Sequence, residues 1–197
     1  MWNERYNQPD YVYGTLPNDF LASVAASLPH GKLLSLGEGE GRNAVYLASL
    51  GYEVTAVDSS DVGLEKARRL AAEKGVQITT ITADLGDFQI QPNHWDAIIS
   101  IFCHVPSAIR LPLHQAVVNG LKPGGVFVLE AFTPRQLEMK TGGPASPDLL
   151  MTLASLRQEL AGLRFVQAAE LDRNVLEGKF HTGQAAVVQI VGIKDAH

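Results

Sequence analysis

Leu33-Leu-Ser-Leu-Gly-Glu-Gly-Glu-Gly-Arg42 is the stretch of this 197-residue chain that decides its fold. Apolar residues lead into glycines at positions 37, 39 and 41, and a segment with helical periodicity follows. Glycine permits a tight turn and lets a ligand approach the backbone, and the first turn of a helix offers unpaired N–H groups. We therefore expect a ligand-binding turn between a strand and a helix.

An acidic residue, Asp58, ends the next apolar segment, Val54-Thr-Ala-Val-Asp58. An acid at that place can accept hydrogen bonds from both hydroxyls of an adenosine ribose. A strand, a glycine turn, a helix and a second strand ending in Asp together make a nucleoside-binding unit. This unit alone does not distinguish a nicotinamide dinucleotide from S-adenosylmethionine.

The spacing and the charge of the turn favour S-adenosylmethionine. The dinucleotide fingerprint is G-x-G-x-x-G, and its last position, counted from Gly37, is occupied here by Arg42. A pyrophosphate would also meet the carboxylates of Glu38 and Glu40 inside the turn, which is electrostatically unfavourable. S-adenosylmethionine carries a sulfonium and an ammonium, which carboxylates attract.

Composition indicates one globular domain, with 46% apolar and 19% charged residues. A net charge of −5 does not attract a polyanion, so no nucleic-acid partner is expected. No apolar run reaches membrane-spanning length and the N-terminus has no apolar signal core, so we expect a cytoplasmic protein without a membrane partner. The single cysteine, Cys103, cannot form an internal disulfide.

Strand and helix patterns alternate along the chain. The expected strands cover residues 32–36, 52–57, 76–82, 95–102, 126–132, 163–171 and 185–193. The expected helices cover residues 17–28, 42–50, 61–74, 106–121 and 148–161, and Lys122-Pro-Gly-Gly125 is expected to be a turn. This alternation predicts an α/β fold with a doubly wound, Rossmann-like parallel sheet. The last two strands have no helix between them, so they should form an antiparallel pair at one edge.

Together these motifs resemble the class I S-adenosylmethionine-dependent methyltransferases, closest to the tellurite-resistance and thiopurine methyltransferase-like branch. The resemblance covers nearly the whole chain. Its motifs are Leu36-Gly-Glu-Gly-Glu-Gly-Arg-Asn43, Val57-Asp58, Ala83-Asp84, Trp95-Asp96, Leu121-Lys-Pro-Gly-Gly125 and the lead-in Tyr13-Gly-Thr-Leu-Pro-Asn-Asp-Phe20. It implies one domain over residues 1–197, with a lid and helix over 1–30 and an insertion over 133–150. It also implies seven strands in the order 3-2-1-4-5-7-6, with strand 7 antiparallel.

The resemblance also implies roles for residues. The turn glycines would meet the methionine end of the cofactor, Asp58 the ribose, and Asp84 with Leu85 the adenine. The family often has an acid where this chain has Ser35, and whether Glu38 or Glu40 replaces it near the methionine ammonium stays open. The cofactor-binding candidates are Gly37, Glu38, Gly39, Gly41, Asn43, Asp58, Ser59, Asp84, Leu85 and Phe102.

The acceptor should lie outside the carboxyl ends of the parallel strands. Segments 2–13, 103–106, 133–147 and 172–182 reach that edge. The aromatic residues Trp2, Tyr6, Tyr11 and Tyr13 could cover a sulfonium or cap apolar surface. His104 is the catalytic candidate, as a proton acceptor, against a structural hydrogen-bonding role. The substrate-side candidates are Tyr13, Arg173, Glu177 and His181.

The sequence therefore predicts a methyltransferase that uses S-adenosylmethionine, releases S-adenosylhomocysteine and acts on a small acceptor such as a thiol or a chalcogen oxyanion. A nicotinamide-dependent oxidoreductase and a non-catalytic S-adenosylmethionine-binding regulator stay open as alternatives. We expect a monomer or homodimer and no metal site. Cys103 is expected to be a buried residue and not a nucleophile, because the chain lacks the basic surface that a nucleic-acid substrate would require.

Overall fold

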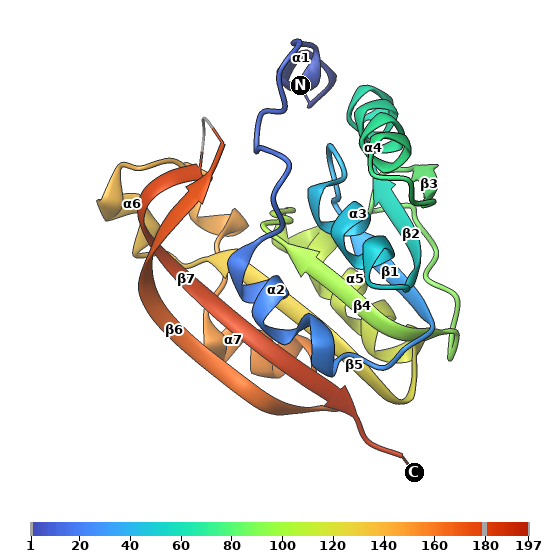
Figure 1. Ribbon diagram of the computed structural model, residues 1–197. Coiled ribbons are helices and arrows are strands. Elements are labelled where there is room, and N and C mark those ends of the chain that lie inside the picture. The colour runs from blue at the N-terminus through green and yellow to red at the C-terminus, as the bar shows by residue number, and fades with distance from the viewer. Residues whose placement is uncertain (1, 179–180, 197) are drawn as a thin grey trace.

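The computed structural model describes residues 2–178 and 181–196, and it contains one seven-stranded sheet in the order β3-β2-β1-β4-β5-β7-β6 (Figure 1). The strands are β1 Lys32–Leu36, β2 Glu53–Asp58, β3 Thr79–Thr82, β4 Trp95–Ile101, β5 Leu121–Phe132, β6 Leu163–Glu177 and β7 His181–Lys194. The strands pair in parallel except for β7, which is antiparallel to both β5 and β6. The predicted fold class, strand order and antiparallel edge pair are confirmed.

Helices cover both faces of the sheet. They are α1 Trp2–Tyr6, α2 Asp19–Val24, α3 Arg42–Ser49, α4 Asp61–Glu73, α5 Ser107–Gly120, α6 Gln136–Met139 and α7 Leu153–Glu159, with 3-10 turns at Ala25–Ser27 and Pro147–Leu149. Apolar side chains of α2, α3 and α4 pack in one core cluster, and those of α5 and α7 pack in the other. Ile99 belongs to the first cluster and its neighbour Ile98 to the second. Successive side chains point to opposite faces, so an unbroken apolar strand serves both cores.

Two features predicted from the sequence are wrong, one because of local capping and one because of an irregularity within a strand. The helix expected over 148–161 begins only at Leu153, because Thr152 and Ser155 form a capping box there. The turn expected at residues 122–125 lies inside β5. The register moves there from Trp95 opposite Leu121 to Ala97 opposite Val126, so the glycines form an irregularity within the strand.

The edge hairpin is longer than its sequence predicts. The connection expected over 172–182 is mostly strand, because β6 continues to Glu177 and β7 begins at His181. Val175 and Glu177 are buried at 1% and 5% exposure, while Leu176 between them is exposed. Polar residues here indicated a loop, but two of them point inward and have partners. Arg173 and Glu177 therefore belong to a strand.

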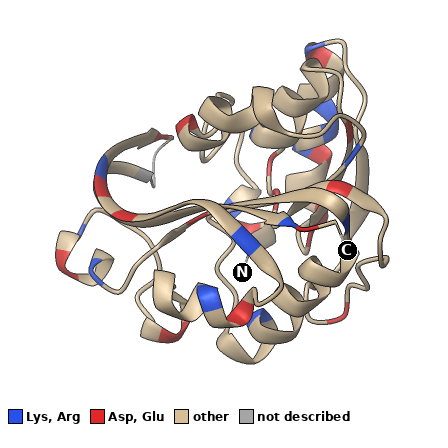
Figure 2. Ribbon diagram, turned by 90° about the horizontal axis from the view of Figure 1, so that it is seen from below, with Lys and Arg blue, Asp and Glu red and all other residues tan. Residues whose placement is uncertain are grey.

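Charged residues of both signs are interspersed along the ribbon (Figure 2). Some pairs are internal: Lys66 meets Glu40, and Arg110 meets Glu159, with all four side chains at most 7% exposed. Buried ion pairs stabilise only when their hydrogen-bonding groups are satisfied. None of the described helices is long and apolar enough to cross a membrane.

Candidate active site

The glycine turn lies between β1 and α3, at the carboxyl edge of the sheet. Gly37, Gly39 and Gly41 have φ angles of 63°, 65° and 91°, in the left-handed region that other residues avoid. A Cβ on any of them would lie 2.6 Å from a neighbouring atom, which belongs to Cys103, Tyr6 or Ala67 respectively. Conformation and packing both require glycine, so the turn has one tightly defined shape.

Glu38 points into the turn and caps the helix behind it. One carboxylate oxygen accepts the N–H groups of Asn43 at 3.1 Å and Ala44 at 2.9 Å, and the other accepts the hydroxyl of Ser35. A negative charge at a helix N-terminus is favourable. Burial nevertheless raises the pKa of the Glu38 carboxyl. Ser35, where the resemblance implies an acid, is thus the partner of an acid three residues later.

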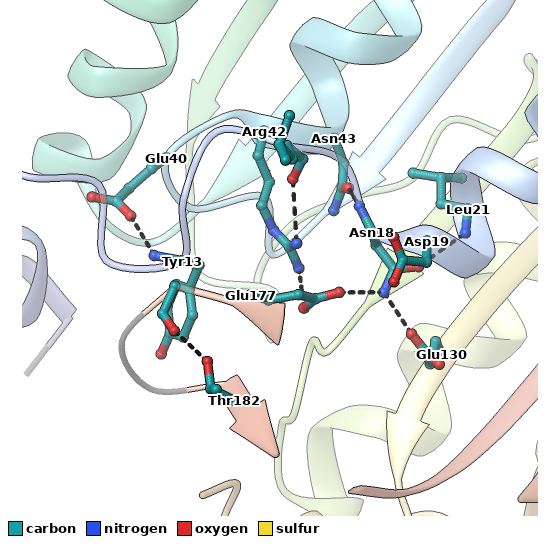
Figure 3. A network of polar contacts seen from close by, with 12 residues as sticks. Tyr13, Asn18, Asp19, Leu21, Glu40, Arg42, Asn43, Glu130, Glu177 and Thr182 are labelled. Atoms are coloured by element: carbon teal, nitrogen blue, oxygen red, sulfur yellow. Dashed lines mark hydrogen bonds and ion pairs between the residues drawn. The ribbon is translucent and has the colours of Figure 1, made fainter. Parts of the chain in front are cut away.

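Glu40 points toward the N-terminal segment (Figure 3). Its Oε2 accepts the N–H groups of Val12 at 2.7 Å and Tyr13 at 3.4 Å. Its Oε1 accepts a hydrogen bond from Lys66 Nζ, also at 2.7 Å. Both oxygens of this carboxylate, which is 4% exposed, are therefore engaged by protein groups. The choice between Glu38 and Glu40 as the acid that meets the methionine ammonium stays open.

Asp58 lies beside the turn at the end of β2. Its Oδ2 accepts the Gly39 N–H and its Oδ1 the Ser60 N–H, each at 2.8 Å. Burial raises the pKa of its carboxyl above the ordinary value. The backbone oxygen of Asp58 accepts the Ala83 N–H at 3.0 Å, so the segment with Asp84 and Leu85 is next to it. The tertiary structure thus brings the turn, Asp58 and the end of β3 to one edge.

The remaining cofactor candidates differ in exposure. Asn43 is buried and its side-chain oxygen accepts the Asn18 N–H at 2.9 Å. Ser59 and Asp84 are exposed, and Asp84 accepts the Gly86 N–H in a turn. Their roles toward the cofactor stay predictions.

Phe102 follows β4 in a backbone conformation that is rare for its type, with φ 51°. Such conformations cost of order 1–3 kcal/mol and occur preferentially at functional sites. The Phe102 ring lies 4.6 Å from the Phe132 ring and 6.3 Å from the His104 ring, measured between centroids. These three rings form an aromatic group between the ends of β4 and β5.

His104 has a defined orientation within this aromatic group. Its Nδ1 lies 2.8 Å from the Leu149 carbonyl oxygen, and its Nε2 is 3.5 Å from the Phe132 N–H. A carbonyl can only accept, so Nδ1 carries the proton and Nε2 is an acceptor. This arrangement serves the structural role and also leaves the proton-accepting nitrogen toward β5. The catalytic role of His104 stays a prediction.

Two of the substrate-side candidates, Arg173 and Glu177, belong to a buried ion-pair network. Figure 3 shows Glu177 with its partners Arg42 and Asn18. Arg173 donates from Nε and Nη2 to Glu130, each at 2.7 Å. Glu177 accepts from Arg42 at 2.6 Å and from Asn18 at 2.8 Å. Asn18 and Gln189 complete the partners of Glu130, which is 0% exposed. Both candidates therefore have structural partners, and their contact with an acceptor stays a prediction.

The sequence interpretation missed Glu130, Arg42 and Asn18 as members of this network. An acid inside the apolar run Val126-Phe-Val-Leu-Glu-Ala-Phe132 was a usable signal, because a buried charge requires partners. Which residues supply those partners was not readable from spacing.

The other candidates are placed as follows. Tyr13 is half-buried and its hydroxyl accepts a hydrogen bond from Arg5 at 3.1 Å. His181 begins β7, and its side chain lies outside the described residues.

Burial raises the pKa of the Cys103 thiol to about 12, so the thiol is protonated at neutral pH. That agrees with the prediction that Cys103 is not a nucleophile.

The chemistry of the turn fits S-adenosylmethionine. A carboxyl group, that of Asp58, is hydrogen-bonded to the turn at Gly39, and two further acids belong to the turn itself. Arg42, the one basic side chain of this stretch, points away to Glu177. A pyrophosphate would find carboxylates and no basic side chain from the turn, whereas a cationic ligand is electrostatically matched.

Residues 33–125 match the family model described as a methyltransferase domain. The 2-heptyl-1-hydroxyquinolin-4(1H)-one methyltransferase of Mycobacteroides abscessus is 26% identical over 140 residues, which are 70% of this chain and 62% of the relative. The probable S-adenosyl-L-methionine-dependent methyltransferase TehB of Haemophilus influenzae is 36% identical over 96 residues, which are 45% of this chain and 33% of the relative. The chain thus spans less than two thirds of the length of these curated relatives.

Solved structures share the fold over almost the whole chain. The crystal structure of TehB from Haemophilus influenzae aligns with a TM-score of 0.75 and 18% identity, covering 98% of this chain and 66% of that one. A structure concerned with conversion of a disulfide bond into a thioacetal group during echinomycin biosynthesis aligns with a TM-score of 0.77 and 22% identity, covering 96% and 85%. The fold, the turn and these similarities support a class I S-adenosylmethionine-dependent methyltransferase near the tellurite-resistance branch.

Proposed function

We propose that the protein transfers a methyl group from S-adenosylmethionine to a small acceptor. The observation that carries the proposal is the meeting of the glycine turn and Asp58 at one sheet edge, joined by the 2.8 Å bond from the Gly39 N–H. The relative named for methylating 2-heptyl-1-hydroxyquinolin-4(1H)-one supports a small acceptor. A nicotinamide cofactor is disfavoured because Arg42 occupies the last glycine position of the dinucleotide fingerprint. The Glu38 carboxyl also occupies the start of α3, where a pyrophosphate would bind.

The turn glycines would hold the methionine end of the cofactor, Asp58 its ribose, and Asp84 with Leu85 its adenine. S-adenosylmethionine supplies a methyl group that is already activated by the positive charge of the sulfonium. The protein then has to align the acceptor and exclude water. Residues 1–30, as a lid and helix, and residues 133–150, as the insertion after β5, are the segments proposed to do so.

On the acceptor side, the aromatic group of Phe102, His104 and Phe132 would form one wall. His104 Nε2 would accept a proton if the acceptor arrives as a hydroxyl or thiol, giving up its long 3.5 Å contact with the Phe132 N–H. The Leu149 carbonyl supports that role, because it holds the proton on Nδ1 and keeps Nε2 an acceptor. An acceptor that arrives as an anion requires no such base.

One thermal-shift experiment tests the cofactor. S-adenosylhomocysteine at a hundredfold excess over its dissociation constant stabilises by about 2.7 kcal/mol, which raises the Tm by roughly 5–10 °C for a chain of this length. NADH should leave the Tm unchanged. A shift with NADH and none with millimolar S-adenosylhomocysteine would contradict the proposal. A screen of thiols, hydroxyquinolines and chalcogen oxyanions for S-adenosylhomocysteine release then separates an enzyme from a non-catalytic binder.

A further inference from the structure

A strap formed by residues 2–13 lies against the cofactor turn and α4. Its anchoring point is Glu40, which stands between Gly39 and Gly41 and accepts the N–H groups of Val12 and Tyr13 (Figure 3). Lys66, from α4, donates both to Glu40 and to the Asp10 carbonyl oxygen, each at 2.7 Å. Val12, Glu40 and Lys66 are 0%, 4% and 4% exposed, so this contact is closed to water.

The strap makes further contacts with cofactor-site residues. Asn3 accepts the Ser60 hydroxyl at 2.6 Å, and Ser60 also binds Asp58. The Tyr6 hydroxyl lies 2.6 Å from where a Cβ of Gly39 would be. Burial, with Asp58 nearby, raises the pKa of the Tyr6 hydroxyl, so the ring presents a neutral hydroxyl there. The strap, which is distant in sequence from the turn, thus contacts the turn and, through Ser60, is linked to Asp58.

We propose that Glu40 is a positioning residue that latches the strap onto the cofactor turn, so that cofactor binding and docking of the strap are coupled. The inference rests on the proposed function for the identity of the ligand. Both carboxylate oxygens of Glu40 accept hydrogen bonds, one from the strap and the other from Lys66, so Glu40 joins the strap to α4. A buried carboxylate that lost the Val12 and Tyr13 donors would be left short of partners, which favours the docked state.

Coupling follows from the position of Glu40 within the turn. The flanking Gly39 packs against Tyr6 of the strap and donates its N–H to Asp58, so the docked strap supports the part of the turn that the cofactor is proposed to occupy. Linkage is reciprocal: if the docked strap favours the cofactor, the cofactor favours docking by the same factor. Typical couplings of this kind change affinity roughly 5- to 150-fold.

The chain carries a natural reporter of strap docking. Trp2 lies on the strap, 5.7 Å from the Tyr6 ring, and is 41% exposed. The only other tryptophan, Trp95, is buried, and its Nε1 has no hydrogen-bond partner among the described residues. Trp95→Phe therefore removes a buried donor that has no partner and leaves Trp2 as the sole tryptophan.

In the Trp95→Phe background, acrylamide quenching of Trp2 and calorimetric titration with S-adenosylhomocysteine are measured for three variants. Glu40→Ala removes the latch, and we expect quenching to rise and affinity to fall roughly 5- to 150-fold. Glu40→Gln keeps an acceptor for the Val12 N–H but loses the charge facing Lys66, so it should rescue part of both losses. Glu53→Ala removes an exposed carboxylate at the opposite end of β2 and is the matched control, with neither quantity changed.

A folded Glu40→Ala protein with the affinity and quenching of its parent would overturn the inference. Should Glu40→Ala not fold, Glu40→Gln and the parent itself decide, since S-adenosylhomocysteine must then reduce quenching of Trp2 in the parent. If the parent ignores S-adenosylhomocysteine altogether, the proposed function fails. Quenching in the Glu40 variants then still decides whether this residue holds the strap.

Discussion

The cofactor turn and the network at the edge hairpin both bury carboxylates, but they satisfy them differently. In the turn, Glu38 and Asp58 accept mainly from backbone N–H groups that are 2 to 19 residues away in sequence. In the network, Glu177 meets Arg42 across 135 residues, and Asn18 reaches it across 159. The turn is therefore a local structure, whereas the network joins the N-terminal segment, α3 and the hairpin.

This difference predicts two kinds of sensitivity. Acids held by backbone donors stay buried without a cation, so burial raises the pKa of both carboxyls. Acids held by guanidinium groups depend on a side chain that one substitution removes. Changes in the network should therefore cost stability, and changes in the turn should cost ligand affinity.

The largest effect is expected from Arg173→Met. It leaves Glu130, at 0% exposure, without its cation, and such a loss typically costs about 3–5 kcal/mol. For this chain length the Tm should fall by roughly 6–20 °C. Differential scanning calorimetry measures the change. The double variant Arg173→Met/Glu130→Gln should recover part of it, because a neutral amide needs no cation and its one oxygen still accepts from either Asn18 or Gln189. A Tm within 2 °C of wild type for the single variant would contradict the role given to the network.

Asp58→Ala should show the opposite pattern. Charge-assisted hydrogen bonds contribute about 1.5–3 kcal/mol each, so affinity for S-adenosylhomocysteine should fall roughly ten- to a thousandfold, since two ribose bonds need not add. The protein should still fold, because its two lost bonds are to backbone groups at a strand end. Calorimetric titration of a folded variant with unchanged affinity would refute the assignment of Asp58 to the ribose.

The pH dependence of stability separates acids by the direction of their pKa. The pKa of Asp58 is raised from 3.8 by burial, so wild type should lose stability relative to Asp58→Asn as pH rises through the folded-state value. Glu159 is different: despite burial, its hydrogen bonds and ion pairs with His114 and Arg110 lower its pKa from 4.5. Wild type should therefore lose its advantage over Glu159→Gln as pH falls below about 4.5.

Denaturant titrations of the three proteins from about pH 3 to neutrality, a range that includes the ordinary pKa values of carboxyl groups, measure these slopes. The two comparisons are wild type with Asp58→Asn and wild type with Glu159→Gln. If the difference in stability changes with pH in the same direction in both, the acid in the turn and the acid between α5 and α7 are not held differently.

The smallest effect is expected from Cys103→Ser. The thiol is buried against Gly37, and a serine hydroxyl can keep the contact with Ser100. We expect a loss of about 1 kcal/mol and S-adenosylhomocysteine affinity close to that of wild type. Once an acceptor is known, a folded variant about a thousandfold slower would instead indicate a covalent nucleophile.

Local pattern was sufficient for the fold class. Strands that are buried on both faces, such as Trp95–Ile101, and the glycine turn follow from residue type and spacing. The strand order was implied by the family resemblance and is confirmed. Boundaries were less predictable where local signals competed. Polar residues 172–177 read as a loop and are strand, and the helix near residue 150 starts at its capping box.

The sequence by itself determined the fold class, the turn and the position of Asp58, because these depend on residues close to one another along the chain. Only the tertiary structure decided that Glu40 holds the strap and that Glu130 and Glu177 meet Arg173, Arg42 and Asn18. A charged residue inside an apolar strand indicates that a partner is required, but its position in the sequence does not identify that partner. Many residues can satisfy a carboxylate, and the choice among them is made by how the strands and helices pack.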